Sequence, residues 1–397
     1  MSKYGEYRIM TLKQTIHSGF GSLEKLEGIL KNYDVSRVMV VTGKKSFESS
    51  GAKAHIISAL KDFEVTYFSD FETNPKLDDA RKGVKLINKN SIELLICVGG
   101  GSVIDMTKLI KAFCLDPDKS DSLARGMIKI NDPNIPIISI PTTAGSGSES
   151  THFAVVYINQ DKFSVAHNCL FPNEVVLDGQ LTISASRYQK ACNVLDAISQ
   201  SIESAWAVGA TKESQKLSYT ALKLCMGSFE EYVNSDNSIN AAQSMIEASN
   251  FAGQAINISK TTAAHAWSYG ISMRYSIPHG HAVWTTLPRI FKVHSTEKGL
   301  KVNDPRGAKH FNKTMKNLKK IMKISNDENL IKYFDTLLTS IGIKENLKEH
   351  IAILESERKS LSVAVNQERM SNNPVEFSDE QVDYIFEMEN NGENKSD

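Results

Sequence analysis

The stretch ELLICVGGGSVIDMTK, residues 93–108, places a run of apolar residues directly before three glycines and a serine. The apolar run predicts a buried strand, and the residues after the glycines predict a helix. Glycines let the backbone approach a ligand closely, and the free N–H groups at a helix N-terminus suit a phosphate. Many strand-to-helix turns use glycines for geometry alone, so this stretch by itself leaves phosphate binding open.

Similar β-branched runs alternate with helical patterns through the first half of the chain. They occur at residues 37–43, 62–70, 93–101 and 135–143. Strand, helix and strand in repetition predict a parallel sheet. Two alternating runs within residues 153–167 predict a hairpin, and EVVLD at 174–178 predicts a last strand.

The character of the chain changes near residue 184. Amphipathic segments such as SQKLSYTALKLCMGSFEEYV, residues 214–233, replace the strand patterns. We therefore expect an α/β domain over residues 1–183 and an all-helical domain over residues 184–388. The polar residues 389–397 predict a disordered tail.

The composition narrows the classes of partner. With 397 residues the chain is too long for one ordinary core, which favours two domains. Lys plus Arg and Asp plus Glu each number 46, so no net charge steers the protein toward nucleic acid or an anionic membrane. No apolar run approaches the ~20 residues that cross a bilayer, and the N-terminus lacks the apolar core of a signal peptide. The five scattered cysteines suit reduced thiols, and we expect a cytoplasmic protein.

A second loop, PTTAGSGSE at residues 141–149, follows another predicted strand. Its small hydroxyl and glycine residues suit the lining of a nucleotide site. Because it stands at a strand end like the glycine loop, it strengthens the interpretation of that loop as a phosphate site.

Residue types that bind metals occur in the helical half. Asp196 and Gln200 are four residues apart and share one face of a predicted helix. His265 lies on an apolar helical stretch, and His279 lies in a rigid loop, IPHG. Together they make a plausible divalent site. The spacing alone leaves two ordinary interpretations open, a solvated helix face for the Asp–Gln pair and a packed core residue for His265.

Four motifs occur along the chain in this order: GGGSVID, PTTAGSGSE, DAISQSIE and H-x13-H with IPHG. The same order is seen in the iron-containing (group III) alcohol dehydrogenase family, which the chain resembles over nearly its whole length. RMSNNP, residues 369–374, extends the resemblance. It implies the dehydroquinate synthase-like fold, with a nucleotide-binding α/β domain followed by an all-helical domain that holds a divalent metal, Fe²⁺ before Mn²⁺ or Zn²⁺. Carried over by position, the metal ligands are Asp196, Gln200, His265 and His279. Gln200 departs from the histidine usual in the family, and Tyr269 stands where many members have another histidine.

Within the family the chain resembles the phosphonoacetaldehyde reductase branch, on residues 259–283, residues 201–214 and the predicted hairpin. The resemblance implies reversible hydride transfer between a nicotinamide and an aldehyde with an anionic head group, and we expect phosphonoacetaldehyde, reduced to 2-hydroxyethylphosphonate in phosphonate biosynthesis. The candidate proton donors are Tyr269 and His281, which could equally be packed residues. The candidate head-group ligands are His152, Lys260 and Arg274, which could equally be solvated or capping residues.

The remaining expectations concern the cofactor and the assembly. The cofactor-binding candidates are Gly43, Lys44, Gly99, Gly100, Gly101, Ser102, Asp105, Thr142 and Thr143. We expect NADP(H) rather than NAD(H), because Gly43 stands where many NAD-using members have an Asp that repels a 2′-phosphate, and lysines follow it. Two lysines on a solvated turn are the ordinary alternative. We also expect a homodimer. A general alcohol dehydrogenase, a nucleotide-binding protein without catalysis and a lyase resembling dehydroquinate synthase stay open as other functions.

Overall fold

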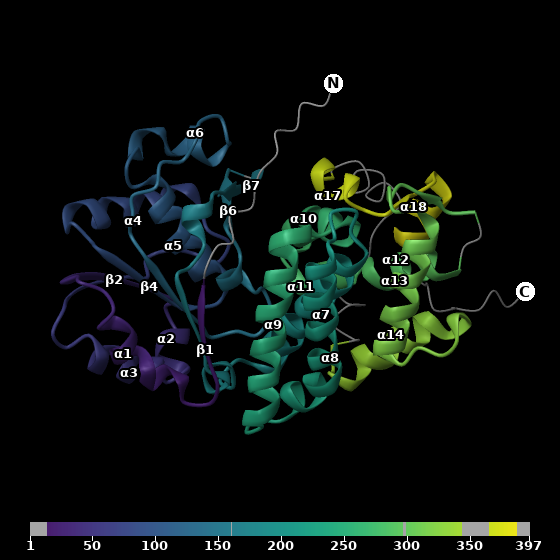
Figure 1. Cartoon of the computed structure of the whole chain (residues 1–397), viewed down its shortest axis with the longest axis horizontal. Helices are drawn as coiled ribbons and strands as arrows, with labels where there is room; N and C mark the ends of the chain where they lie inside the picture. The colour runs from purple at the N-terminus through teal and green to yellow at the C-terminus, as the bar shows by residue number, and fades with distance from the viewer. Residues whose placement is uncertain (1–13, 160, 297–298, 344–364, 387–397) are drawn as a thin grey trace, which may run out of the picture. The chain divides into compact units, whose positions relative to one another are not determined.

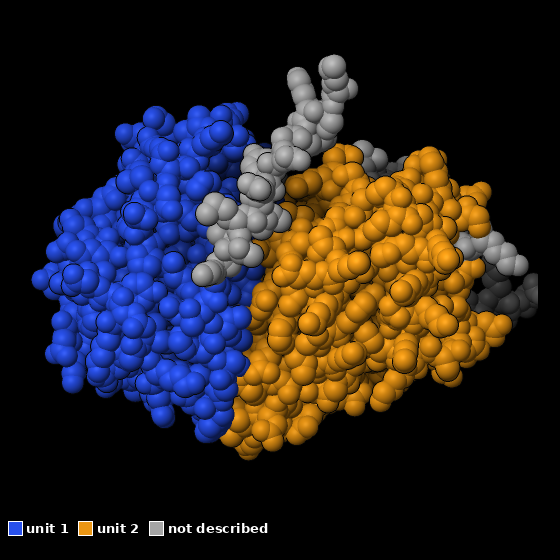
Figure 2. All heavy atoms as spheres, viewed as in Figure 1, with its two compact units in different colours: residues 1–142, 148–181 blue, residues 143–147, 182–397 orange. Residues whose placement is uncertain are grey.

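The computed structural model describes residues 14–159, 161–296, 299–343 and 365–386. The chain forms two compact units, one made of residues 1–142 and 148–181 and the other of residues 143–147 and 182–397, shown in blue and orange in Figure 2. The predicted tail at residues 389–397 lies outside the described residues. Among the helices that are described, none is both long enough and apolar enough to pass through a bilayer.

The first unit contains the predicted parallel sheet. Its strands are β1 (Thr15–Ser18), β2 (Arg37–Thr42), β3 (Glu64–Phe68), β4 (Leu94–Gly99), β5 (Ile137–Pro141) and β8 (Glu174–Leu177), in the order β1-β8-β5-β4-β2-β3. Every neighbouring pair is parallel. The runs predicted as strands are confirmed, whereas β1 was not predicted because its sequence, TIHS, carries no apolar run.

Helices cover both faces of this sheet (Figure 1). They are α1 (Leu26–Leu30), α2 (Ser46–Ser49), α3 (Ala52–Ala59), α4 (Leu77–Lys89), α5 (Gly101–Phe113) and α6 (Ser120–Ala124). Val38 and Val40 face the core with α1 and α3, while Met39 and Val41 face the core with α4 and α5. Both faces of the strand are buried, which is why parallel strands read as continuous apolar runs.

The predicted hairpin is also confirmed, as the antiparallel pair β6 (Phe153–Ile158) and β7 (Asp161–Ala166). A buried lysine joins α5 to the start of this hairpin. Lys108 Nζ donates to the carbonyls of Ser148 at 2.6 Å and Thr151 at 2.7 Å. Asp105 accepts from Ser148 Oγ at 2.5 Å and from the Val155 N–H at 3.0 Å. Both oxygens of Asp105 are therefore engaged inside the first unit.

The described part of the second unit is helical, with one small exception. Its helices are α7 (Arg187–Trp206), α8 (Lys212–Asn234), α9 (Ile239–Ser259), α10 (Ala263–Tyr275), α11 (His279–Trp284), α12 (Leu287–Thr296), α13 (Gly307–Met322), α14 (Leu330–Ser340), α17 (Gln367–Ser371) and α18 (Asp379–Phe386). β9 (Lys301–Val302) and β10 (Val375–Glu376) form a two-residue antiparallel ladder that the expectation of an all-helical domain missed. Strands this short carry no periodicity.

The segment 143–147 belongs to the second unit although it lies within the sequence of the first. A Cβ at Gly145 would stand 2.7 Å from Asn193 Cα on α7. A Cβ at Gly147, where φ is +60°, would stand 2.5 Å from the Ser249 carbonyl on α9. These two glycines of the second loop therefore allow close packing against helices, a use that the sequence did not distinguish from ligand binding.

An aromatic cluster in the second unit encloses a histidine. The ring of His294 stacks on Phe377 at 5.7 Å and meets Trp206 edge-on at 4.6 Å. Neither ring nitrogen has a hydrogen-bond partner in the described part of the chain. Burial lowers the pKa of His294 to about 3. The ring is therefore held neutral.

Replacing His294 by leucine is expected to reduce the sensitivity of the second unit to acid. Because the pKa of His294 is lower in the folded protein than in the unfolded protein, protonation favours the unfolded chain. The stabilising contribution of the neutral ring is therefore present above about pH 6.5 and is lost as the pH falls toward 3. Between pH 7 and pH 5 the wild type should lose about 2 kcal/mol more than His294→Leu. Urea unfolding of metal-free protein, followed by tryptophan fluorescence, measures this, since Trp206, Trp267 and Trp284 all lie in the second unit. His55→Leu, at an exposed position, is the control; equal losses in wild type and His294→Leu would contradict the account.

Candidate functional site

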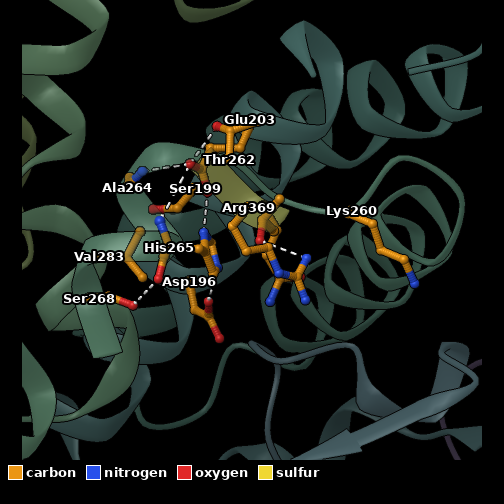
Figure 3. Close-up of polar contacts among 12 residues, drawn as sticks. Asp196, Ser199, Glu203, Lys260, Thr262, Ala264, His265, Ser268, Val283 and Arg369 are labelled. Carbon is orange, nitrogen blue, oxygen red and sulfur yellow. Dashed lines mark hydrogen bonds and ion pairs between the residues drawn. The ribbon is translucent and has the colours of Figure 1, made fainter. Parts of the chain in front are cut away.

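Three predicted metal ligands lie together in the second unit. Asp196 on α7, His265 on α10 and His279 on α11 each offer a ligand atom, and these atoms all lie within 4.8 Å of one another. Asp196 and His265 are buried, and His279 is half-buried. Figure 3 shows Asp196 and His265 pointing toward each other from their two helices. His279 begins α11 rather than lying in a loop, as its sequence context had suggested.

Gln200 adds a fourth donor on the same face of α7 as Asp196. Its Nε2 donates to the Ser146 carbonyl at 3.1 Å. That bond fixes the amide, so that Oε1 is the atom left for another partner. Gln200 Oε1, Asp196 Oδ1 and His265 Nε2 are all buried and have no hydrogen-bond partner among the described residues. Buried polar atoms are rarely left unsatisfied, and a divalent ion would satisfy all three.

The distances also suit an ion. Asp196 Oδ1 lies 3.5 Å from His265 Nε2. Two donors that each bind one ion at about 2.1 Å in tetrahedral geometry are separated by about 3.4 Å. The residues present therefore fit a divalent metal, with two imidazoles, one carboxylate and one amide oxygen as the donor set.

Glu203 is a residue of this site that the sequence interpretation did not single out. Its carboxylate is fully buried and accepts a hydrogen bond from Nδ1 of His265. It also accepts from Thr262 Oγ1 at 2.7 Å and from the Ala264 N–H at 2.9 Å, at the start of α10. The carboxylate thus caps α10 and turns the Nε2 of His265 toward Asp196, as carboxylates behind metal-binding histidines do. Its position seven residues after Asp196, on the same helix face, was the available signal.

The charges at the cluster favour a cation. Burial lowers the pKa of His265, but the carboxylates of Glu203 and Asp196 outweigh it and raise the pKa to about 9. Two carboxylates flanking one imidazole make the cluster electronegative, as a cation site requires.

Gly280 determines how closely α11 approaches α7. A Cβ at this position would stand 2.1 Å from the Cys192 carbonyl and 2.9 Å from the Asp196 side chain. The glycine of IPHG is therefore needed for close helix packing, which brings His279 next to Asp196. His279 Nδ1 lies 3.4 Å from Ser268 Oγ.

The two candidate proton donors lie in different surroundings. Tyr269 stacks on the ring of His279, with ring centres 5.9 Å apart. His281 is fully buried, and its Nδ1 lies 2.9 Å from the hydroxyl of Tyr188. Tyr188 precedes Asp196 by eight residues, about 12 Å along α7. The structure thus brings Tyr269 beside the metal cluster and joins His281 to a more distant part of α7.

Two of the predicted head-group ligands, Lys260 and Arg274, belong to the second unit, and His152 belongs to the first. Arg274 is exposed in the last turn of α10, about 14 Å along the helix axis from His265. Lys260 directly follows α9 as its C-cap, five residues before His265. His152 belongs to the first unit, where its carbonyl accepts from the His167 N–H at 3.1 Å. Lys260 therefore stands at the start of the segment that leads into α10, whereas Arg274 stands at the far end of that helix.

The predicted nucleotide-binding residues follow three adjacent strands of the first unit. Gly43 follows β2, Thr142 follows β5, and Gly99 ends β4 and leads through Gly100 into α5. A Cβ at Gly99 would stand 2.4 Å from Val103, so this turn requires glycine. No described side chain caps α5, which leaves its N-terminus, at Gly101 and Ser102, available to an anion. Thr143 is in the second unit.

Replacing Gln200 by histidine is expected to shift the metal preference toward Zn²⁺. The formal charge of the donor set stays the same, while an imidazole binds Zn²⁺ more tightly than an amide oxygen does. Protein exposed to equal Fe²⁺ and Zn²⁺ without oxygen, and then analysed for bound metal, should show a higher Zn:Fe ratio than the wild type. Gln189→His, at an exposed position on the same helix, is the matched control. An unchanged ratio would show that Gln200 is not a ligand.

Comparisons with known proteins agree with the fold of the two units. The family model for iron-containing alcohol dehydrogenase matches residues 13–179, and the C-terminal model of the Fe-containing alcohol dehydrogenase family matches residues 190–389. Long-chain-alcohol dehydrogenase 1 of Geobacillus thermodenitrificans is 26% identical over 379 residues, 94% of each chain. Phosphonoacetaldehyde reductase of Streptomyces viridochromogenes is 27% identical over 231 residues, 56% of this chain and 58% of that protein.

A solved structure is similar over almost the whole chain. Sulfoacetaldehyde reductase from Bifidobacterium kashiwanohense, in complex with NAD⁺, superposes with a TM-score of 0.83 at 26% identity, covering 94% of this chain and 96% of that one. Together the two family models match most of the sequence. The chain belongs to the iron-containing alcohol dehydrogenase family of oxidoreductases.

Proposed function

We propose that the protein is a metal-dependent reductase of a small aldehyde with an anionic head group, most closely phosphonoacetaldehyde, which it converts to 2-hydroxyethylphosphonate. Family membership supports the coarser activity, a nicotinamide-linked alcohol dehydrogenase with a divalent metal. The observation that carries the chemistry is the set of buried donors of Asp196, Gln200 and His265, which have no hydrogen-bond partner among the described residues. The anionic substrate class is supported by two relatives named for phosphono- and sulfoacetaldehyde.

The reaction balances as aldehyde plus NAD(P)H plus a proton, giving alcohol plus NAD(P)⁺. A divalent ion, when bound, supplies a Lewis acid that polarises the aldehyde carbonyl, which stabilises the transition state by several kcal/mol. Asp196, Gln200, His265 and His279 would hold it. Glu203 keeps the His265 ring in its orientation. We assign Tyr269, beside His279, to hold the proton that the product oxygen takes up.

The cofactor part of the proposal is that NADP(H) is preferred to NAD(H). Gly43 and the exposed Lys44 follow β2, which leaves no carboxylate at the strand end. Asp70 acts against this preference, since its Oδ1 lies 4.0 Å from Lys44 Nζ. We expect a higher kcat/KM with NADPH than with NADH, and a further rise of that ratio in Asp70→Asn. A clearly higher kcat/KM with NADH would overturn the preference.

The substrate is tested by assaying metal-reconstituted protein without oxygen. Phosphonoacetaldehyde, sulfoacetaldehyde and butyraldehyde are compared with both cofactors. An anionic aldehyde should have a kcat/KM about 10- to 100-fold above that of butyraldehyde, as charge-assisted hydrogen bonds allow. Equal values for the three aldehydes would instead favour a general alcohol dehydrogenase. Absence of turnover and of bound metal would favour a nucleotide-binding protein without catalysis.

A further inference from the structure

Two cationic residues of the second unit, Lys260 and Arg369, are held by elements next to those that carry the metal cluster. Arg369 on α17 is buried, and its Nη1 donates to Thr261 Oγ1 at 3.0 Å. Thr261 is the residue after Lys260. Burial and the charge of Arg369 both lower the pKa of Lys260, to about 8, while the exposed Glu368 acts in the opposite sense. Like charges brought together in a partly buried place cost free energy, so this arrangement calls for a reason.

The backbone at Lys260 is held in an unfavourable conformation. Its φ is +63° and its ψ is −179°, a region that residues with a side chain rarely adopt. Asn372 maintains it, because its Nδ2 donates to the carbonyls on either side, Ser259 at 2.8 Å and Thr261 at 2.9 Å. Asn372 Oδ1 accepts from the Gly209 N–H at 2.8 Å. The RMSNNP motif therefore supplies both Arg369 and the clamp that sets the direction of Lys260.

This cationic pair is linked to the metal cluster through consecutive residues. Thr261 accepts from Arg369, and the next residue, Thr262, donates to Glu203 at 2.7 Å. Glu203 in turn holds His265. Figure 3 shows the guanidinium of Arg369 on the side of Asp196 and His265 that faces Lys260. Helix α17 packs against α10, which carries His265.

We propose that Lys260 and Arg369 form an anion subsite that binds the phosphonate or sulfonate head group of the substrate while its carbonyl lies at the metal cluster. This rests on the proposed function. An anion offsets the repulsion between the two cations and the cost of their burial. A guanidinium fork and a rotatable ammonium suit the several oxygens of a tetrahedral head group. The strained backbone fixes Lys260 before the ligand arrives.

The test uses metal-loaded, full-length protein with ethanesulfonate as the probe. This molecule has the head group but no carbonyl, and it stays a monoanion at every working pH. It should inhibit the wild type competitively with the aldehyde. In Lys260→Met its inhibition constant should rise about 10- to 100-fold, as the loss of a charge-assisted bond implies. In Arg369→Lys, which keeps the charge and removes the fork, a rise of severalfold is expected. Lys292→Met replaces another half-buried lysine of the same unit and is the control.

The aldehyde panel separates this proposal from the proposed function. The ratio of kcat/KM for sulfoacetaldehyde to that for butyraldehyde should fall at least tenfold in Lys260→Met. If the wild type prefers anionic aldehydes and both variants keep that preference, the subsite is refuted while the function stands. If the wild type shows no such preference, the substrate assignment fails. If ethanesulfonate does not inhibit the wild type, the subsite is refuted whatever the aldehyde. Bound metal in each variant confirms that the second unit is folded.

Discussion

Asp196→Ala and His265→Ala are each expected to lose the bound metal and to lower kcat/KM at least about 1,000-fold. The Lewis acid contributes several kcal/mol to the transition state, and each 1.36 kcal/mol is a factor of ten in rate. Removing either side chain leaves three of the four metal ligands. It also removes the neighbour of the other buried ligand, since the ligand atoms of Asp196 and His265 lie 3.5 Å apart. Metal analysis of the purified variants, together with anaerobic assays at saturating cofactor, measures both effects.

Asp383→Ala, at an exposed position on α18, is the control and should behave as the wild type. A fluorescence titration of nicotinamide binding should give the same result in all variants, because the nucleotide-binding residues belong mainly to the first unit. Full metal content in either Asp196→Ala or His265→Ala would mean that the metal site is elsewhere.

Glu203→Gln is expected to weaken metal binding about 10- to 100-fold. This is the range found when the residues that hydrogen-bond to metal-binding histidines are changed. The amide can still accept from the Ala264 N–H, so α10 keeps its cap. It supplies no charge to His265 Nδ1, and the ring loses the partner that sets its tautomer. Activity should therefore be low at limiting metal and return toward the wild-type kcat when metal is saturating.

This recovery distinguishes a positioning residue from a ligand. Asp196→Ala should stay inactive at metal concentrations that restore Glu203→Gln. Glu230→Gln, exposed on α8, is the matched control. If Glu203→Gln binds metal with wild-type affinity, the carboxylate acts only as a helix cap, and the loss would appear in unfolding experiments instead.

Much of the fold could be predicted because each element carried its own pattern. β2, β4, β5 and β8 are buried on both faces and read as apolar runs, and α7 and α8 carry the amphipathic pattern of a helix. The predicted metal residues gather because Asp196 and Gln200 share a face of one helix. β1 could not be predicted, since TIHS becomes a strand only by pairing with β8, far along the chain.

The supporting residues could not be recognised for a related reason. Glu203 looks like any acidic residue on an amphipathic helix until its contact with His265, 62 residues later, is known. Arg369 meets Thr261 across 108 residues. Gly280 was interpreted as part of a rigid loop, whereas the structure uses its lack of a side chain to bring α11 close to α7. Local spacing can identify donors on one helix, but the residues that orient them come from tertiary contacts.

The segment 143–147 has a consequence for how such proteins can be recombined. The chain passes from one unit to the other after residues 142, 147 and 181. A gene cut at residue 182 would give a helical fragment without Ser146, whose carbonyl holds the amide of Gln200. A chimera that exchanged the nucleotide-binding half as one cassette would pair α7 and α9 with a foreign loop at Gly145 and Gly147, where no side chain fits. Cofactor and metal specificity can therefore be exchanged independently only if this five-residue segment travels with the helical half.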